Sequence, residues 1–314
     1  MRPRVLACAL VPSLLGCASV KPGATPSSDA GIGDTAAPAD VAPGADARAD
    51  TSSPMDLLSF DFPPPVDRPP PEPGRVYAHS ADLLYLLEPI SKKVTMVGAF
   101  DCTTAMVDIA VDRAGKMTGT AAISFNNALG GALVTVDPAT AHCTVLNRGE
   151  NLVTSLTYVP EGTLLPNAEA LVGYSEDRYV RIDPTTGSLT DIGLLNNAAS
   201  GGIKWLSSGD VVSIKDGGTY LTVKPETGAM PGGDRIVEVN PKTGALVRII
   251  GPTGIDDVLG LGYWGGIAYG FTLGGVLMQI NLMTGAGTDI PIPDAPLLSF
   301  LGAGTTTIAP IIIE

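Results

Sequence analysis

The chain has 314 residues, a formal net charge of −13 and only 5% aromatic residues. Because the chain is strongly acidic and its Lys and Arg residues are not clustered, it is repelled by nucleic acid phosphates and by anionic membrane surfaces. We therefore expect no nucleic acid partner.

The N-terminus has the pattern of an export signal. Arg2 and Arg4 precede an apolar stretch from Val5 to Leu15 that is too short to span a bilayer. The sequence Leu-Leu-Gly-Cys that ends at Cys17 resembles the lipobox of bacterial lipoproteins. The resemblance implies that residues 1–16 are removed and that Cys17 carries a lipid. An ordinary secretory signal that is cut elsewhere is the alternative.

Residues 17–74 are predicted to form the lipidated cysteine and a disordered linker. From Ala18 to Gly74 the chain is rich in Ala, Pro, Asp, Gly and Ser, and it contains two proline triplets, Pro63 to Pro65 and Pro69 to Pro71. Such a composition cannot bury enough apolar surface to fold. We expect the folded domain to cover residues 75–314.

The folded part repeats a short phrase, an apolar run followed by Asp or Asn, usually Pro, and then Thr-Gly. The clear copies are Leu133–Ala141, Tyr179–Gly187, Ile236–Gly244 and Leu277–Gly285, with a degenerate copy at Leu84–Lys92. Apolar and polar residues alternate before the acid or amide, which indicates a strand. Asp or Asn, Pro and Gly then suit a short hairpin turn. Lys92 and Ala141 stand where the turn calls for Gly, so these turns must close differently or under strain.

The spacing of the phrase predicts an all-β propeller of five blades. The acid or amide recurs at intervals of 49, 46, 57 and 41 residues, at Glu88, Asp137, Asp183, Asn240 and Asn281. Each interval holds about four short strands, as a propeller blade does. We expect the C-terminal strand, around Ser299 to Ala309, to complete the blade begun at Val76 to Gly98 and so to cover two edge strands.

One extra copy of the phrase, Tyr220–Gly228, precedes Asn240 too closely to be a whole blade. We interpret it as an additional hairpin on the fourth blade. A six-bladed ring is the first alternative, and two stacked sheets are the second.

Cys102 and Cys143 remain in the folded part and flank the second inferred blade. In an exported protein the environment favours a disulfide, so we predict a bridge between them. Two buried free thiols are the alternative.

The sequence contains no catalytic or cofactor-binding signature. A nucleophile motif Gly-x-Ser-x-Gly, a dinucleotide fingerprint and a phosphate-binding loop are all missing, and a His/Cys zinc site would need more ligands than the chain supplies. We predict no catalytic residue, cofactor or metal. Loops that join blades, or the middle strands of a blade, crowd one face of a propeller, where ligands dock. The candidate ligand-binding residues are Asn126, Asn127, Asn151, Glu176, Asn196, Asn197, Asp256, Asp257 and Trp264. Trp264 has a second interpretation, as a ring packed between adjacent blades.

The strand, the Asp-Pro-x-Thr-Gly turn and the phrase from Val107 to Met117 together resemble the repeats of YVTN, NHL and quinoprotein-like propellers. The resemblance covers about residues 76 to 310. It implies protein or ligand binding in many members, and lactone hydrolysis or quinone-dependent oxidation in some. The tryptophan-rich docking signature of quinoproteins is absent, which argues against that cofactor.

We therefore predict a lipid-anchored module of the bacterial cell envelope that binds a protein or small molecule without catalysis. The main alternative is a glycosidase-like or lactonase-like hydrolase that uses carboxylates at the channel mouth, and a purely structural envelope protein is a third. Ala18 and Ser19 after Cys17 favour the outer membrane by analogy with sorted lipoproteins.

Overall fold

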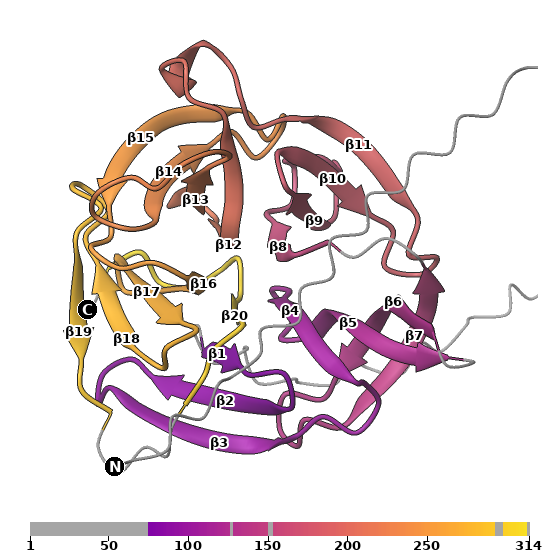
Figure 1. The fold of residues 1–314 in the computed structure, drawn as a ribbon. Coiled ribbons are helices and arrows are strands. Elements are labelled where there is room, and N and C mark those ends of the chain that lie inside the picture. Colours follow the sequence, from indigo (N-terminus) through magenta and orange to yellow (C-terminus); the bar gives the residue numbers. More distant parts are fainter. Residues whose placement is uncertain (1–74, 126–127, 150–152, 293–297, 313–314) are drawn as a thin grey trace, which may run out of the picture. The chain divides into compact units, whose positions relative to one another are not determined.

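A computed structural model describes residues 75–125, 128–149, 153–292 and 298–312. In this part of the chain five antiparallel sheets of four strands form a ring, a five-bladed β-propeller (Figure 1). The five-bladed prediction is confirmed, and the six-bladed and two-sheet alternatives are wrong. The predicted signal and linker, residues 1–16 and 17–74 with Cys17, lie outside the described residues.

Each blade extends from an inner strand next to the axis to an outer strand at the rim. In that order, blade 1 contains β20 (Gly302–Thr305), β1 (Val76–His79), β2 (Leu83–Glu88) and β3 (Lys93–Ala99). Blade 2 contains β4 (Ala105–Val111), β5 (Met117–Phe125), β6 (Ala128–Val136) and β7 (Cys143–Gly149). Blade 3 contains β8 (Ser155–Val159), β9 (Ala170–Ser175), β10 (Arg178–Ile182) and β11 (Leu189–Leu194). Blade 4 contains β12 (Trp205–Ile214), β13 (Gly218–Pro225), β14 (Arg235–Val239) and β15 (Leu246–Pro252), and blade 5 contains β16 (Val258–Trp264), β17 (Ile267–Thr272), β18 (Leu277–Ile280) and β19 (Gly287–Ile290). A short 3₁₀-helix, η1 (Ala198–Ser200), joins blades 3 and 4.

The ring is closed by pairing of the two ends of the domain. β20 pairs with β1 in an antiparallel register that places Thr305 opposite Val76 and Gly302 opposite His79. The C-terminal strand thus becomes the inner strand of the blade that the N-terminal strands begin, as the spacing of the repeats predicted. Closure in this way covers the edge of β1, while the other edge of β20 faces the axis, as the inner edge of every blade does.

The extra copy of the phrase, Tyr220–Gly228, is not an additional hairpin. Tyr220 to Pro225 belong to β13, which pairs with β12 on one side and β14 on the other. The interpretation of this copy was wrong because apolar alternation marks any half-buried strand, whatever its position in a blade. Residues 226–234 then form a connection to β14, which lengthens the interval.

The repeat turns have the conformation that their residues require. In the turn of blade 3, Asp183 accepts hydrogen bonds from the N–H groups of Thr185 and Thr186 (2.8 and 3.0 Å), and Gly187 has φ of 69°. Lys92 and Ala141 occupy the equivalent position with φ of 61° and 66°. Two turns therefore hold a non-glycine residue in the left-handed region, which is the strain that the sequence predicted.

The repeat turn of blade 4 also packs against the preceding blade. The Tyr174 hydroxyl of blade 3 donates to the Gly244 carbonyl in this turn (2.6 Å), and the Tyr179 hydroxyl donates to the Pro241 carbonyl (2.9 Å). A Cβ on Gly244 would lie 2.2 Å from the Cβ of Tyr179. The turn is therefore a contact between blades as well as a hairpin connection.

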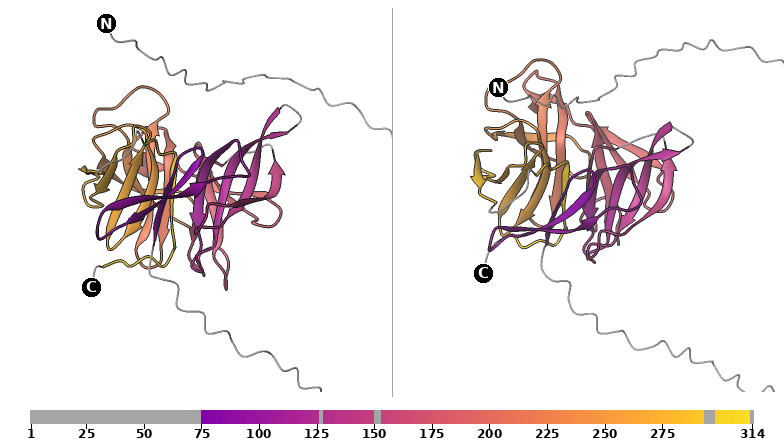
Figure 2. Two further views of the ribbon diagram at one scale, coloured as in Figure 1. Left: turned by 90° about the horizontal axis from the view of Figure 1, so that it is seen from below. Right: turned by 60° about the horizontal axis from the view of Figure 1, so that its bottom comes forward.

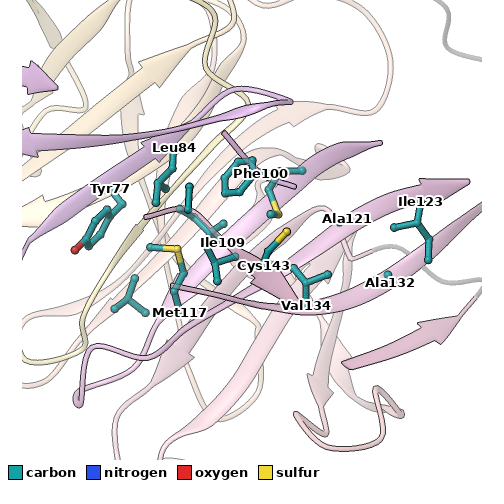
Figure 3. Close-up of a cluster of buried hydrophobic side chains, with 14 residues drawn as sticks. Tyr77, Leu84, Phe100, Ile109, Met117, Ala121, Ile123, Ala132, Val134 and Cys143 are labelled. Atoms are coloured by element: carbon teal, nitrogen blue, oxygen red, sulfur yellow. The ribbon is translucent and has the colours of Figure 1, made fainter. Parts of the chain in front are cut away.

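Apolar clusters fill the wedges between blades. Figure 3 shows the cluster between blades 1 and 2, in which Leu84 of β2 lies near Ile109 of β4 and Val134 of β6. Cys143 belongs to this cluster and is bonded to Cys102, with Cα atoms 5.5 Å apart, so the predicted disulfide is confirmed. A bridge across a sequence separation of 41 residues stabilises a fold by about 4 kcal/mol in the chain-entropy treatment.

Candidate functional site

The inner strands define two faces of the ring. β20, β4, β8, β12 and β16 all run in the same direction, since each blade contributes an even number of antiparallel strands before the next begins. The connection face is where these strands begin, and it carries the segments that join one blade to the next, such as residues 195–204 and 253–257. The exit face is where they end, and it carries residues 112–116, 160–169, 215–217, 265–266 and 306–312. The side views of Figure 2 show the blades beside one another between these two faces.

The structure brings together most of the described ligand-binding candidates on the connection face. Asn196, Asn197, Asp256 and Asp257 lie in segments that join blades, and Glu176 lies in the β9–β10 turn beside them, where its carbonyl accepts from the Ser207 N–H (3.0 Å). Asn126, Asn127 and Asn151 fall outside the described residues.

Trp264 lies apart from this group. It ends β16 and therefore lies at the exit face, where it packs against the cluster between blades 5 and 1.

The amides of Asn196 and Asn197 are used within the fold. Asn196 accepts from the Trp205 N–H (2.8 Å) and donates to the Trp205 carbonyl (2.9 Å). Asn197 caps η1 and donates to the Leu246 carbonyl (2.7 Å). Both side chains therefore position the connection between blades 3 and 4.

The axis of the ring holds a buried polar cluster that the sequence pattern did not reveal. Asp108 of β4 and Asp210 of β12 are fully buried and approach the same stretch of β20. Asp210 accepts from the Ala303 N–H (3.2 Å), and a Cβ on the adjacent Gly302 would lie 2.3 Å from Asp108 Oδ1. Burial and the adjacent Asp210 raise the pKa of Asp108 well above its ordinary value, and burial raises the pKa of Asp210. Asp108 interrupts the apolar run of β4, and that was the available signal, because carboxylates are rarely buried without a partner. Asp210 follows Ser207, Ser208 and Gly209 in β12 and gave no such signal.

His79 of β1 borders this pair. Its Nδ1 donates to the Ser80 carbonyl (2.8 Å), which leaves Nε2 without a hydrogen on it, 3.7 Å from Oδ1 of Asp108. Burial lowers the pKa of His79 to about 4, so the imidazole is neutral at physiological pH. Among the described residues, no group of three His, Cys, Asp or Glu side chains is arranged to hold a metal ion.

A hollow of about 300 Å³ lies at the mouth of the axis on the exit face. Its walls come from blades 2, 3 and 4 and from the segment after β20, and its polar lining includes Arg113, Glu161, Glu169, Lys215 and Thr307. Side chains from four parts of the chain therefore meet at a single opening.

The two carboxylates of this mouth are held in place by the surrounding protein. Glu169 accepts hydrogen bonds from the Arg113 N–H (2.8 Å) and from the Thr307 hydroxyl, and Glu161 forms an ion pair with the Arg113 guanidinium. Partial burial raises the pKa of Glu169. The mouth thus presents both signs of charge within one small cavity.

A second hollow on the exit face, of about 570 Å³, lies between blades 4 and 5. Its lining includes Tyr220, Tyr263, Met283 and Ile311. Met283 is 81% exposed, and Ile312, beside Ile311 in the chain, is 65% exposed. Large apolar side chains with such exposure are a common feature of docking surfaces when they are grouped.

Comparisons with known proteins give a likeness of fold only. A scan against protein-family models finds no match, and a comparison with curated proteins finds none. Solved structures with a similar arrangement include TolB from Acinetobacter baumannii, at 14% identity and a TM-score of 0.39 over 71% of this chain and 51% of TolB. An oligogalacturonate lyase in complex with manganese has 11% identity and a TM-score of 0.37 over 68% of this chain and 61% of the lyase. BamB from Moraxella catarrhalis has 13% identity and a TM-score of 0.32 over 68% of this chain and 71% of BamB. The chain covers less than two thirds of the lyase and of TolB.

The one helix that the structure describes, η1, spans three residues, and no helix among the described residues is long and apolar enough to cross a bilayer.

Proposed function

We propose that this protein is a lipid-anchored module of the bacterial cell envelope whose propeller binds a partner protein through the exit face, without catalysis. The observation that carries this proposal is the grouping of features on that face. The charged mouth, the hollow between blades 4 and 5 and the exposed Met283 and Ile312 all belong to it. Apolar contact area beside a polar rim is the usual composition of a protein interface.

Burial of the axial carboxyl pair supports a role without catalysis. Asp108 and Asp210 have no exposed surface, and their oxygens accept hydrogen bonds from backbone N–H groups. A glycosidase needs two carboxyl groups that face a sugar across an open pocket. The axial pair does not face such a pocket.

The hydrolase alternative is favoured by one observation, the presence of Glu161 and Glu169 in the same hollow with the pKa of Glu169 raised. A general acid needs such a pKa. However, both carboxylates are engaged by Arg113, and Glu169 also accepts from Thr307. Binding is therefore the better supported function. Hydrolysis of glycosides or lactones by the wild type, lost in Glu169→Gln, would favour the hydrolase instead.

Anchoring rests on the lipobox at Cys17 and on the linker that follows it. We expect a radiolabelled fatty acid fed to cells to appear on the wild-type protein and not on Cys17→Ser. Equal labelling of the two proteins would contradict the anchor.

The docking face is tested by photo-crosslinking in cells. A photoreactive amino acid is placed at Met283, which lines the exit-face hollow, or at Leu273, an apolar residue in the β17–β18 turn that is 44% exposed. Leu273 lies toward the connection face, where its N–H donates to the Asp257 carbonyl. We expect a discrete adduct from position 283 and none from 273. Adducts from position 273 alone, or from neither position, would overturn the proposal.

A further inference from the structure

Two carboxyl groups at the axis accept hydrogen bonds from backbone N–H groups of all five inner strands. Asp108 accepts from Ile109 of β4 (2.9 Å) and from Leu156 of β8 (2.5 Å). Asp210 accepts from Val211 of β12 (2.6 Å), Leu261 of β16 (2.9 Å) and Ala303 of β20 (3.2 Å). Because the two carboxyls also meet beside Gly302 and Ala303 of β20, each blade is joined to the same pair.

The surroundings of the pair offer no compensating positive charge among the described residues. Both side chains are fully buried. From β1 comes the neutral His79, whose Nε2 lies 3.7 Å from Asp108 Oδ1, and from β20 comes Gly302, which does not titrate. A Cβ on Gly302 would lie 2.3 Å from both Asp108 Oδ1 and His79 Nε2, so the site is tightly packed. Two adjacent carboxylates in such a place cannot both be ionised.

We propose that Asp108 and Asp210 share one proton and act as a clasp that holds the five blades together at the axis, so that loss of this proton as the pH rises loosens the ring. The clasp is common to all five sheets, whereas each apolar cluster joins only neighbouring blades.

The sign of the pH dependence follows from the direction of the pKa shifts. The pKa of the pair is raised on folding, so the folded state binds more protons and the free energy of unfolding falls as pH rises above the ordinary Asp value. The pKa of His79 is lowered from 6.5 to about 4, so its contribution falls as pH drops from 6.5 toward 4. The two effects oppose each other in that range. Above pH 6.5 His79 no longer changes the free energy of unfolding with pH, and the carboxyl pair still does.

The test is the number of protons that the full chain, with its disulfide intact, binds on folding at pH 7.5. Calorimetric unfolding in buffers of different ionisation enthalpy measures this number. We expect the wild type to bind about one proton more than Asp108→Asn, in which the amide supplies the hydrogen that the two carboxyls otherwise share. Equal numbers would overturn the proposal. If Asp108→Asn does not fold, the wild-type value decides, because the absence of uptake excludes a shared proton.

His79→Gln identifies the group that holds the proton. We expect this variant to bind the same number of protons at pH 7.5 as the wild type. As the pH falls from 6.5 to 4, its stability should rise relative to that of the wild type, because the opposing effect of His79 is gone. If His79→Gln abolishes the proton uptake instead, the proton resides on the imidazole, and the clasp is an ordinary ion pair between His79 and Asp108.

Discussion

The rim and the axis of this propeller are stabilised in opposite ways. At the rim, a similar turn is repeated in every blade, and the copy in blade 4 contacts its own strands and the preceding blade. At the axis the side chains differ from blade to blade, and the cluster of Asp108, Asp210 and His79 is assembled from blades 2, 4 and 1. The rim therefore divides its stability among five similar turns, whereas the axis concentrates it in one cluster.

The largest effect is expected from the axis. Asp210→Ala removes the acceptor of three N–H groups and leaves Asp108 without its partner. We expect a loss of about 3–5 kcal/mol in the free energy of unfolding, because breaking a buried pair leaves the remaining group in an apolar environment without compensation. Chemical denaturation of the disulfide-bonded protein measures this loss.

A rim acid provides the matched control for Asp210→Ala. Asp183 also accepts two backbone N–H groups, but its carboxylate is exposed. We expect Asp183→Ala to have a clearly smaller effect than Asp210→Ala. Similar losses in the two variants would show that the axis has no special part in holding the ring.

The same contrast explains what the sequence could predict. The repeat turn is encoded within nine residues, as in Tyr179–Gly187, so its hairpin, the number of blades and the closing strand could be inferred from periodicity and turn chemistry alone. The axial pair depends on Asp108 and Asp210, which lie 102 positions apart by their numbering and meet only once the ring has closed. A single acid in an apolar strand marks a buried carboxyl, but it does not identify the partner.

The two faces were predictable to different degrees. The residues that join blades were expected to share a face, and Asn196, Asn197, Asp256 and Asp257 do so. The exit-face mouth was not expected, because Arg113, Glu169 and Thr307 belong to unrelated turns with no common motif. Polarity also could not show that the Asn196 and Asn197 amides are used by the backbone of neighbouring segments.

A smaller effect is expected at the rim, and a pair of glycines separates its two causes. Gly244 and Gly228 both have positive φ, 71° and 78°, but a Cβ on Gly244 would meet Tyr179 of the preceding blade, whereas a Cβ on Gly228 would meet nothing within 4 Å. Gly228→Ala should cost about 1–2 kcal/mol, the cost of the left-handed conformation alone. Gly244→Ala should cost about 1–3 kcal/mol more, because the Tyr179 ring must move to make room.

Denaturation midpoints of the two glycine variants, measured side by side, give the difference. If the repeat turn served only to reverse the chain within its own blade, both substitutions would lower the free energy of unfolding by the same amount. The fold already accepts a side chain with positive φ in two such turns, at Lys92 and Ala141. A larger loss for Gly244→Ala means that the turn is also a contact between blades. Contacts at the rim then join neighbouring blades in pairs, whereas the cluster at the axis joins all five blades.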